Sequence, residues 1–169
     1  GLYMYTGSQS EQGEGYYHSG LFGEPVGATI KNVRLLYSYV NNRAYIGAIA
    51  GRAYNVTFEN IYTNARLGGR QDIGGIVGTL AGGKVINCWF DGSIEATADL
   101  DTSGFAHCGG IVGSINTSES TIASCLNTGT INSKGKRTGG FVGVNQDIRF
   151  NLYDSISLGE IICTQTTNV

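Results

Sequence analysis

The sequence predicts an all-β protein that folds as a right-handed parallel β-helix (β-solenoid) of about five coils, each about 30 residues long with three short strands. Two observations favour this fold class. A glycine-bracketed apolar box recurs at intervals of 28, 27, 35 and 30 residues. Between the boxes lie short runs of β-branched and aromatic residues separated by Gly, Asn, Ser and Thr, which is typical of strands and turns. A β-propeller is disfavoured, because its blades need about 40 residues and four strands each.

The first strand of each coil is predicted in the box itself. The boxes are Ser-Gly-Leu-Phe-Gly at 19–23, Gly-Ala-Ile-Ala-Gly at 47–51, Gly-Gly-Ile-Val-Gly at 74–78 and 109–113, and Gly-Gly-Phe-Val-Gly at 139–143. Glycine permits turns and close backbone approach. Because equivalent residues lie over one another in a solenoid, the central residues are expected to form one apolar ladder: Ile49, Ile76, Ile111 and Phe141.

A polar residue follows each box at a regular distance. It stands nine residues after the closing glycine in the first three units and eleven residues after it in the last two. This column consists of Asn32, Asn60, Asn87, Ser124 and Asp154. We expect a structural ladder that bends the chain between strands and forms hydrogen bonds along the stack; a polar ligand surface is the alternative.

The third strand is predicted in a later block. It reads Gly92-Ser93-Ile94, Gly129-Thr130-Ile131 and Gly159-Glu160-Ile161 in the later units. In the earlier units we align it with Tyr37 to Tyr39 and Ala65 to Leu67.

Composition limits the function classes. The chain has 169 residues and a net charge of −2, which argues against a nucleic-acid partner. It contains no run of 18 apolar residues, so direct membrane insertion is not expected. We expect residues 19–169 to form a single repeat domain. Residues 1–18 are expected to be the end of a truncated upstream coil plus a polar loop, in a fragment of a longer protein.

The boxes, together with Lys84-Val85-Ile86-Asn87-Cys88 and Gly92-Ser93-Ile94, resemble the GLUG repeat of bacterial surface and secreted proteins. The resemblance covers nearly the whole chain. It implies an extracellular or cell-surface, adhesin-like β-helical module, of a kind also found in IgA-cleaving metallopeptidases. It supplies no catalytic residues.

No catalytic constellation is recognisable in the sequence. The two histidines, His18 and His107, lack the spacing of a zinc-peptidase motif, and there is no G-x-S-x-G pattern. We expect no enzyme activity and no cofactor. The enzymatic alternative is a carbohydrate-active β-helix, such as a polysaccharide lyase or a glycosidase, working with carboxylates. The candidate carboxylates for such an enzyme are Asp91, Glu95, Asp99, Asp101, Asp154 and Glu160.

An insertion at 95–108 makes the third unit longer than the others. Within it, Asp99, Asp101 and Ser103 match half of a calcium loop, but the twelfth position is Gly110, so calcium is a weak candidate and a polar surface loop the preferred interpretation. Equivalent turns hold basic residues and, with the insertion, define a candidate ligand-binding edge. Its members are Arg43, Arg70 with nearby Asp72, Asp99, Asp101, His107, Lys136 and Arg137. A solvated basic rim is the structural alternative.

Cysteine and tyrosine add two expectations. Cys88 and Cys125 fall in one inward column, where we expect stacked free thiols, with this pair the one to test for a disulfide. Nine tyrosines crowd the first half of the chain, either packing the first coils or, with arginine, binding sugar or protein.

Taken together, the sequence predicts a non-catalytic module with an adhesion, spacer or recognition role in a bacterial surface or secreted protein. Its partners would be a glycan, a host or surface protein, and the rest of the parent polypeptide. The other alternative is an accessory recognition domain of a secreted peptidase.

Overall fold

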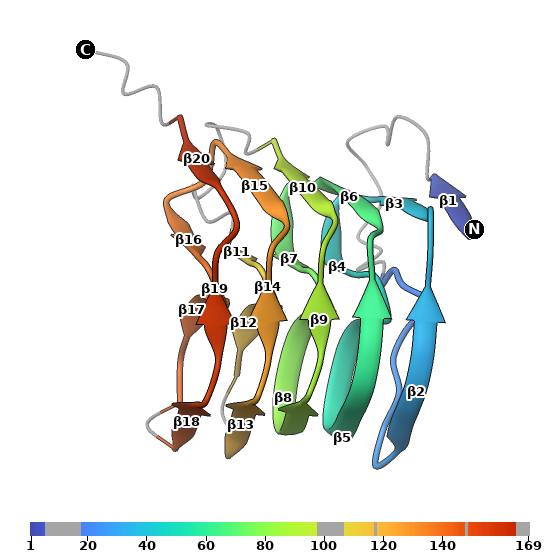
Figure 1. The fold of residues 1–169 in the computed structure, drawn as a ribbon, viewed down its shortest axis with the longest axis vertical. Helices are drawn as coiled ribbons and strands as arrows, with labels where there is room; N and C mark the ends of the chain where they lie inside the picture. The colour runs from blue at the N-terminus through green and yellow to red at the C-terminus, as the bar shows by residue number, and fades with distance from the viewer. Residues whose placement is uncertain (6–17, 98–106, 117, 148, 165–169) are drawn as a thin grey trace.

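The computed structural model describes residues 1–5, 18–97, 107–116, 118–147 and 149–164. These residues contain strands and no helix, and the strands pair in parallel. Each strand pairs with its counterpart one repeat away, so that the coils follow one another from the N-terminal side to the C-terminal side (Figure 1). The predicted parallel β-helix is therefore confirmed.

Three sheets run along the stack. Sheet A has the order β1 (Tyr3–Tyr5), β3 (Tyr39–Asn41), β6 (Arg66–Gly69), β10 (Ser93–Ala96), β15 (Thr130–Ser133) and β20 (Ile161–Cys163). Sheet B contains β4 (Ala44–Gly47), β7 (Gln71–Gly74), β11 (His107–Gly109) and β16 (Arg137–Gly139). Sheet C contains β2 (Thr29–Leu35), β5 (Ala50–Thr63), β8 (Val77–Ile86), β9 (Trp89–Phe90), β12 (Val112–Ile115), β13 (Ser120–Ala123), β14 (Leu126–Asn127), β17 (Val142–Asn145), β18 (Phe150–Tyr153) and β19 (Ile156–Ser157).

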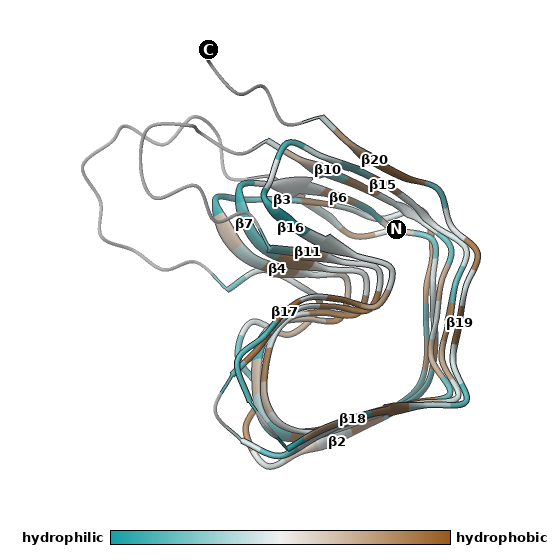
Figure 2. Ribbon diagram, turned by 90° about the vertical axis from the view of Figure 1, so that its left-hand side faces the viewer, coloured by the Kyte–Doolittle hydropathy of each residue, from teal (hydrophilic) through white to brown (hydrophobic). Residues whose placement is uncertain are grey.

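The glycine boxes fold the chain back on itself between sheet B and the first strands of sheet C. Viewed along the stack, this reversal indents the outline of every coil (Figure 2). We call the indentation the notch. Gly78 shows why glycine is needed there: a Cβ atom at this position would lie 2.5 Å from the Ile46 nitrogen and 2.7 Å from the Asp72 oxygen, both of them backbone atoms.

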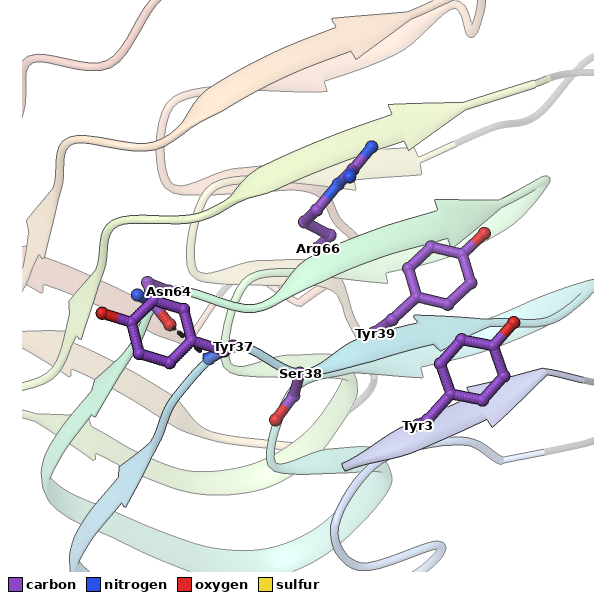
Figure 3. Close-up of a pocket in the computed structure, with 6 residues that line it drawn as sticks. All are labelled: Tyr3, Tyr37, Ser38, Tyr39, Asn64 and Arg66. Carbon is purple, nitrogen blue, oxygen red and sulfur yellow. Dashed lines mark hydrogen bonds between the residues drawn. The ribbon is translucent and has the colours of Figure 1, made fainter. Parts of the chain in front are cut away.

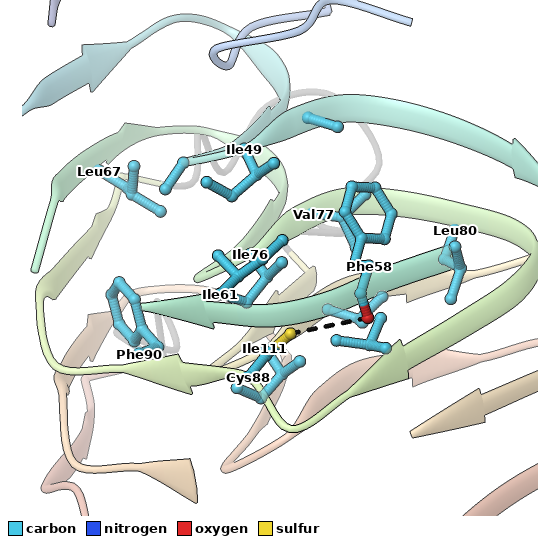
Figure 4. Packing of buried hydrophobic residues seen from close by; sticks show 14 of the residues in the cluster. Ile49, Phe58, Ile61, Leu67, Ile76, Val77, Leu80, Cys88, Phe90 and Ile111 are labelled. Carbon is cyan, nitrogen blue, oxygen red and sulfur yellow. Dashed lines mark hydrogen bonds between the residues drawn. The ribbon is translucent and has the colours of Figure 1, made fainter. Parts of the chain in front are cut away.

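The central residues of the boxes stack at the tip of this reversal. Backbone hydrogen bonds run from one central residue to the next. Ile49 N–H donates to Ile76 O, Ile76 N–H to Ile111 O and Ile111 N–H to Phe141 O, with N to O distances of 2.9–3.0 Å. The three isoleucines are fully buried and Phe141 packs against the same core. The predicted apolar ladder is thus present. Other coil faces add Phe58 and other large buried side chains to the core (Figure 4).

The chain bends sharply at the predicted polar column. Asn32, Asn60, Asn87, Ser124 and Asp154 all have a positive φ, between 49° and 58°. In later coils this residue separates two strands, as Ser124 separates β13 from β14. The glycine box is likewise shared by two strands, one in sheet B and one in sheet C, as the box at 109–113 is by β11 and β12. Two of the three strands predicted for each coil are therefore each replaced by two shorter strands in these coils.

The register in sheet A differs by one residue from the sequence alignment. Tyr39 lies opposite Arg66, and Arg66 lies opposite Ser93. The equivalents of Gly92–Ile94 in the second coil are therefore residues 38–40, not Tyr37 to Tyr39. The register follows from the buried side chains, because Val40, Leu67 and Ile94 lie opposite one another and all three point into the core.

Two further features of the described chain concern sulfur and the membrane. All four cysteines are free thiols; Cys88, Cys108 and Cys125 are buried, and Cys163 is exposed. Cys88 packs in the core within reach of the Phe58 carbonyl oxygen (Figure 4). Within the described ranges, no helix has the length and hydrophobicity needed to cross a bilayer.

Candidate recognition surface

A pocket opens on the outer face of sheet A, in the first coils of the described structure (Figure 3). Its volume is about 570 Å³. The lining residues come from β1, β3 and β6 and from the turns that precede β3 and β6: Tyr3, Tyr37, Ser38, Tyr39, Asn64 and Arg66. Rigid strands therefore position three of the lining side chains.

Register places two tyrosines side by side in this pocket. Tyr3 lies opposite Tyr39 in the parallel pairing of β1 and β3. Their ring centroids are 5.5 Å apart with planes inclined by 31°, which gives a tilted aromatic pair. Arg66 follows Tyr39 in the same outward column, one coil further along. Tyr3, Tyr39 and Arg66 thus form a row parallel to the helix axis.

Tyr37 forms the opposite side of the pocket. Its φ is 50°, and its backbone N–H donates to the side-chain oxygen of Asn64 over 2.7 Å. This backbone conformation directs the Tyr37 phenol ring outward, and the residue is 84% exposed. Tyr3, across the pocket, is 73% exposed. Figure 3 shows Tyr37 and Asn64 on one side and the Tyr3–Tyr39 pair on the other. Large aromatic rings this exposed are common at recognition sites.

The described residues that line the pocket include one positively charged side chain, Arg66, and no acidic side chain. Arg66 is exposed, and its guanidinium makes no ion pair or hydrogen bond with another residue that the structure describes. The Ser38 hydroxyl, by contrast, accepts from Leu2 N over 2.9 Å and donates to Leu36 O over 3.1 Å. The groups left to meet a ligand are therefore the guanidinium, the Asn64 amide N–H groups and the tyrosine hydroxyls. Of these, the Tyr39 hydroxyl already accepts from Asn41 Nδ2 over 3.0 Å and can still donate its own hydrogen.

A second aromatic row lies beside the pocket on strands β2, β5 and β9. Arg34, Tyr62 and Trp89 occupy one column. The Arg34 guanidinium lies 5.4 Å from the Tyr62 ring centroid, and the Tyr62 and Trp89 rings meet edge to face at 4.8 Å. Partial burial raises the pKa of the Tyr62 phenol, and the Asp91 carboxylate raises it further. We name the combined set the aromatic–arginine face: Tyr3, Arg34, Tyr37, Tyr39, Tyr62, Arg66 and Trp89.

The residues predicted for the basic edge lie elsewhere, around the notch and the turn before sheet B. Arg43 and Arg70 are exposed and one coil apart, with the Arg70 N–H bonded to Arg43 O over 3.1 Å. Lys136 is exposed in the turn before β16. Asp99, Asp101 and Ser103 lie outside the described residues, so the calcium hypothesis remains a prediction.

The notch brings together three residues of the predicted edge: Asp72, His107 and Arg137. In adjacent coils, Asp72 Oδ1 lies 2.5 Å from His107 Nδ1, and Arg137 NH1 lies 3.2 Å from His107 Nε2. A guanidinium cannot accept a hydrogen bond, so Nε2 must accept and Nδ1 must donate to Asp72. The Asp–His pair is arranged like the base and orienting acid of a hydrolase, but its outer nitrogen faces a cation rather than a nucleophile.

Other residues of the notch continue this column toward the N-terminus. His18 and Tyr45 precede Asp72, with the His18 and Tyr45 rings 5.1 Å apart, and Arg52 from β5 lies over the Tyr45 ring at 5.6 Å. Within the described residues, no group of three or more His, Cys, Asp or Glu side chains is placed to hold a metal ion. The notch is therefore a packed polar seam between sheets B and C.

The polar column at the bend forms a ladder on the surface. Asn87 donates from Nδ2 to Asn60 Oδ1 over 2.6 Å, and Asn60 donates from Nδ2 to Asn32 Oδ1 over 3.1 Å. Ser124 and Asp154 continue the same left-handed bend. These amides hydrogen-bond to one another from coil to coil, which is the geometry of a structural ladder.

Sequence reasoning considered the tyrosines but did not place the pocket. Tyr39 and Arg66 are 27 positions apart and chemically unlike, so no repeat of side-chain type marks them as neighbours. The pattern of inward-facing apolar residues could have predicted this neighbourhood. Aligning Val40 with Leu67 and Ile94 places Tyr39, Arg66 and Ser93 in one outward row.

Comparison with known proteins identifies similar segments in much longer proteins. The chain is 30% identical over 124 residues to an immunoglobulin A1 protease of Streptococcus sanguinis, which covers 73% of this chain and 7% of that protein. It is 28% identical over 147 residues to an immunoglobulin A1 protease of Streptococcus pneumoniae, covering 83% of this chain and 7% of that protein. No family model and no solved structure matches the chain. The chain is thus a parallel β-helix that spans about 7% of the length of the bacterial proteases it resembles.

Proposed function

We propose that this β-helix is a non-catalytic recognition module of a larger secreted or surface-exposed bacterial protein. Its partner would be a glycan or a host or surface protein. The observation that carries the proposal is the aromatic–arginine face, where Tyr3 and Tyr37 are 73% and 84% exposed beside the exposed guanidinium of Arg66. Tyrosine and arginine are the residues that most often anchor binding interfaces.

The placement of this face suits binding. Its residues project from stacked strands, so little backbone order has to be gained when a ligand binds. A tyrosine also presents a large apolar surface with only two rotatable side-chain bonds and a hydroxyl for hydrogen bonding. A row of such side chains along the axis can hold an extended partner, such as an oligosaccharide chain.

The similarity to short segments of two immunoglobulin A1 proteases supports an accessory role. A module of this kind would hold a substrate or a surface near a catalytic unit elsewhere in the polypeptide. Adhesion and an extracellular location belong to the same proposal. The Asp91 carboxylate beside the face is engaged by hydroxyl groups, at 2.5 Å from Thr128 Oγ1 and 3.3 Å from the Tyr62 oxygen, rather than by a second carboxylate.

The test is an array of neutral and acidic glycans and of bacterial and host surface glycoproteins, run beside a polysaccharide depolymerisation assay with and without calcium. We expect binding without release of reducing or unsaturated ends. A Tyr3→Ala/Tyr37→Ala/Tyr39→Ala variant should lose that binding. The matched control is Tyr153→Ala, because Tyr153 is 54% exposed on β18, outside the aromatic–arginine face. Chain cleavage by the wild-type protein would overturn the non-catalytic proposal, and binding that survives the triple variant would overturn the assignment to this face.

A further inference from the structure

The pocket on sheet A differs from the rest of the aromatic–arginine face in its hydrogen-bonding character. Its accessible groups can all donate N–H or O–H bonds: the Arg66 guanidinium, the Asn64 amide, whose oxygen already accepts from Tyr37 N, and the tyrosine hydroxyls, of which the Tyr39 oxygen already accepts from Asn41 Nδ2. Among the described residues that line it, none is a carboxylate that would compete for the guanidinium. Such a site favours a ligand that carries a negative charge and several acceptor oxygens.

We propose that this pocket binds a carboxylate-bearing sugar residue of a glycan. The inference rests on the proposed recognition function and names its ligand class. The apolar C–H face of a sugar ring would stack on Tyr39 and Tyr3, whose rings form a tilted pair with centroids 5.5 Å apart. The carboxylate would pair with Arg66, which follows Tyr39 in the outward column at the spacing of neighbouring strands, about 4.8 Å.

The dimensions agree with this assignment. A sugar ring is about as wide as the step between two strands, so a ring seated on Tyr39 brings a substituent within reach of Arg66. Tyr37 closes the other side of the pocket (Figure 3). The volume of about 570 Å³ exceeds that of one sugar residue and leaves room for its neighbour in the chain.

An acidic peptide is the competing ligand, and the topology disfavours it. Peptides that bind along sheets usually add a strand to a free edge. Within the pocket, β3 is paired on one side with β1 and on the other with β6, so its backbone groups are not free to bind another strand. β1 is the end strand of sheet A, but its open edge faces away from β3 and Arg66, so a peptide strand added there would lie beyond Tyr3 and not beside the guanidinium. A sugar needs no backbone partner, since rings and side-chain donors suffice.

The experiment measures affinity by calorimetry for three acidic probes: a hyaluronan tetrasaccharide, trigalacturonate and sialyllactose. Each is compared with its methyl ester, which keeps the rings and removes the charge. We expect at least one acid to bind about tenfold or more tightly than its ester, with weaker binding at high salt. Arg66→Gln should abolish this preference, whereas Tyr39→Ser should weaken acid and ester alike. Lys84→Gln is the matched control, because Lys84 is exposed on β8 and lies outside the pocket.

The outcomes separate the inference from the proposed function. Equal affinity for acids and esters, unchanged in Arg66→Gln, would overturn the carboxylate assignment while leaving a glycan-binding face. Tighter, Arg66-dependent binding of a polyglutamate peptide than of all three sugars would overturn the sugar assignment. Absence of binding to these probes and to every member of the array would overturn the proposed function itself. Thermal unfolding of each variant checks that a loss of affinity is not a loss of fold.

Discussion

Asp72 and His107, 35 residues apart in sequence, lie one coil apart in the notch, with Asp72 Oδ1 2.5 Å from His107 Nδ1. Both residues are buried, being 5% and 6% exposed. The hydrogen bond therefore links two successive coils at the place where glycine boxes bring sheets B and C together. Arg137 extends the link to a third coil through His107 Nε2.

Replacing Asp72 by Asn should lower the free energy of unfolding by about 1–2 kcal/mol, because it exchanges a buried hydrogen bond to a charged carboxylate for a weaker one to a neutral amide oxygen. Asparagine retains the left-handed conformation of this position, where φ is 50°, so the change reports the charge and not the backbone. Chemical denaturation measures the loss.

Arg137→Ala provides the comparison in the same chain of contacts. Arg137 is exposed, so its removal should cost less, about 0.5 kcal/mol. Equal losses for the two variants would contradict the view that the buried carboxylate is the important partner of His107.

Asn60 should show how much the surface amide ladder stabilises the stack. Asn60→Gly keeps a residue that tolerates the φ of 54° but removes the bonds to Asn32 and Asn87, so we expect a loss of about 1 kcal/mol. Asn60→Ala should lose about 1–2 kcal/mol more, because alanine is strained in this conformation. Denaturation midpoints of the two variants, measured together, separate the ladder from the backbone. If Gly and Ala proved equally destabilising, the left-handed bend would not be a constraint.

Gly78 and Gly23 both close a box, but they should respond differently to alanine. A Cβ atom at Gly78 would lie 2.5–2.7 Å from backbone atoms of Gly51, Ile46 and Asp72, so Gly78→Ala should cost about 3 kcal/mol or more. A Cβ atom at Gly23 meets one atom, His18 O at 3.4 Å, so Gly23→Ala should cost less than about 0.5 kcal/mol. Thermal unfolding of both variants tests the difference. A well-folded Gly78→Ala protein with wild-type stability would show that the two walls of the notch can move apart.

The buried thiols predict a loss of stability in alkali. Burial raises the pKa of Cys108 from an ordinary value of 9.0 to about 12, and a hydrogen bond with Cys125, together with burial, raises the pKa of Cys88. A raised thiol pKa means that the unfolded chain ionises first. The contribution of Cys108 to stability is therefore complete below pH 9 and is lost as the pH rises toward 12.

The measurement is the free energy of unfolding at several pH values from 7 to above 9, for the wild type and for Cys108→Ala. The variant should have a constant deficit at neutral pH and a shallower decline in alkali. Parallel curves for the two proteins would mean that other groups cause the decline.

The repeating part of the molecule could be predicted from sequence because like residues stack on like. Ile49, Ile76 and Ile111 occupy the same place in successive boxes and stack in one buried column. Burial in one column requires an apolar side chain at that place in every coil, so the residue type repeats along the sequence. The bend at the polar column could also be predicted, and its positive φ suits asparagine, which tolerates this conformation better than most residues.

The candidate site could not be derived in the same way, because its neighbours are unlike. Tyr39 beside Arg66, and Asp72 beside His107, share a column without sharing a chemistry. An outward residue is free to vary from coil to coil, and a shift of one residue in the alignment moves it to the other face of the sheet. Only the strand register, set by inward residues such as Val40 and Leu67, defines these pairs.

Each coil contributes one residue to the outward row of sheet A that contains Tyr3, Tyr39 and Arg66. Each coil is also formed by one continuous stretch of chain. Duplicating such a stretch in the gene would therefore lengthen the outward row by one step, because the new coil would bury its inward residues against coils of the same pattern. Deleting one would shorten the row in the same way. A protein built like this can change the length of its outward row through recombination between repeats, without any point mutation in the residues of that row.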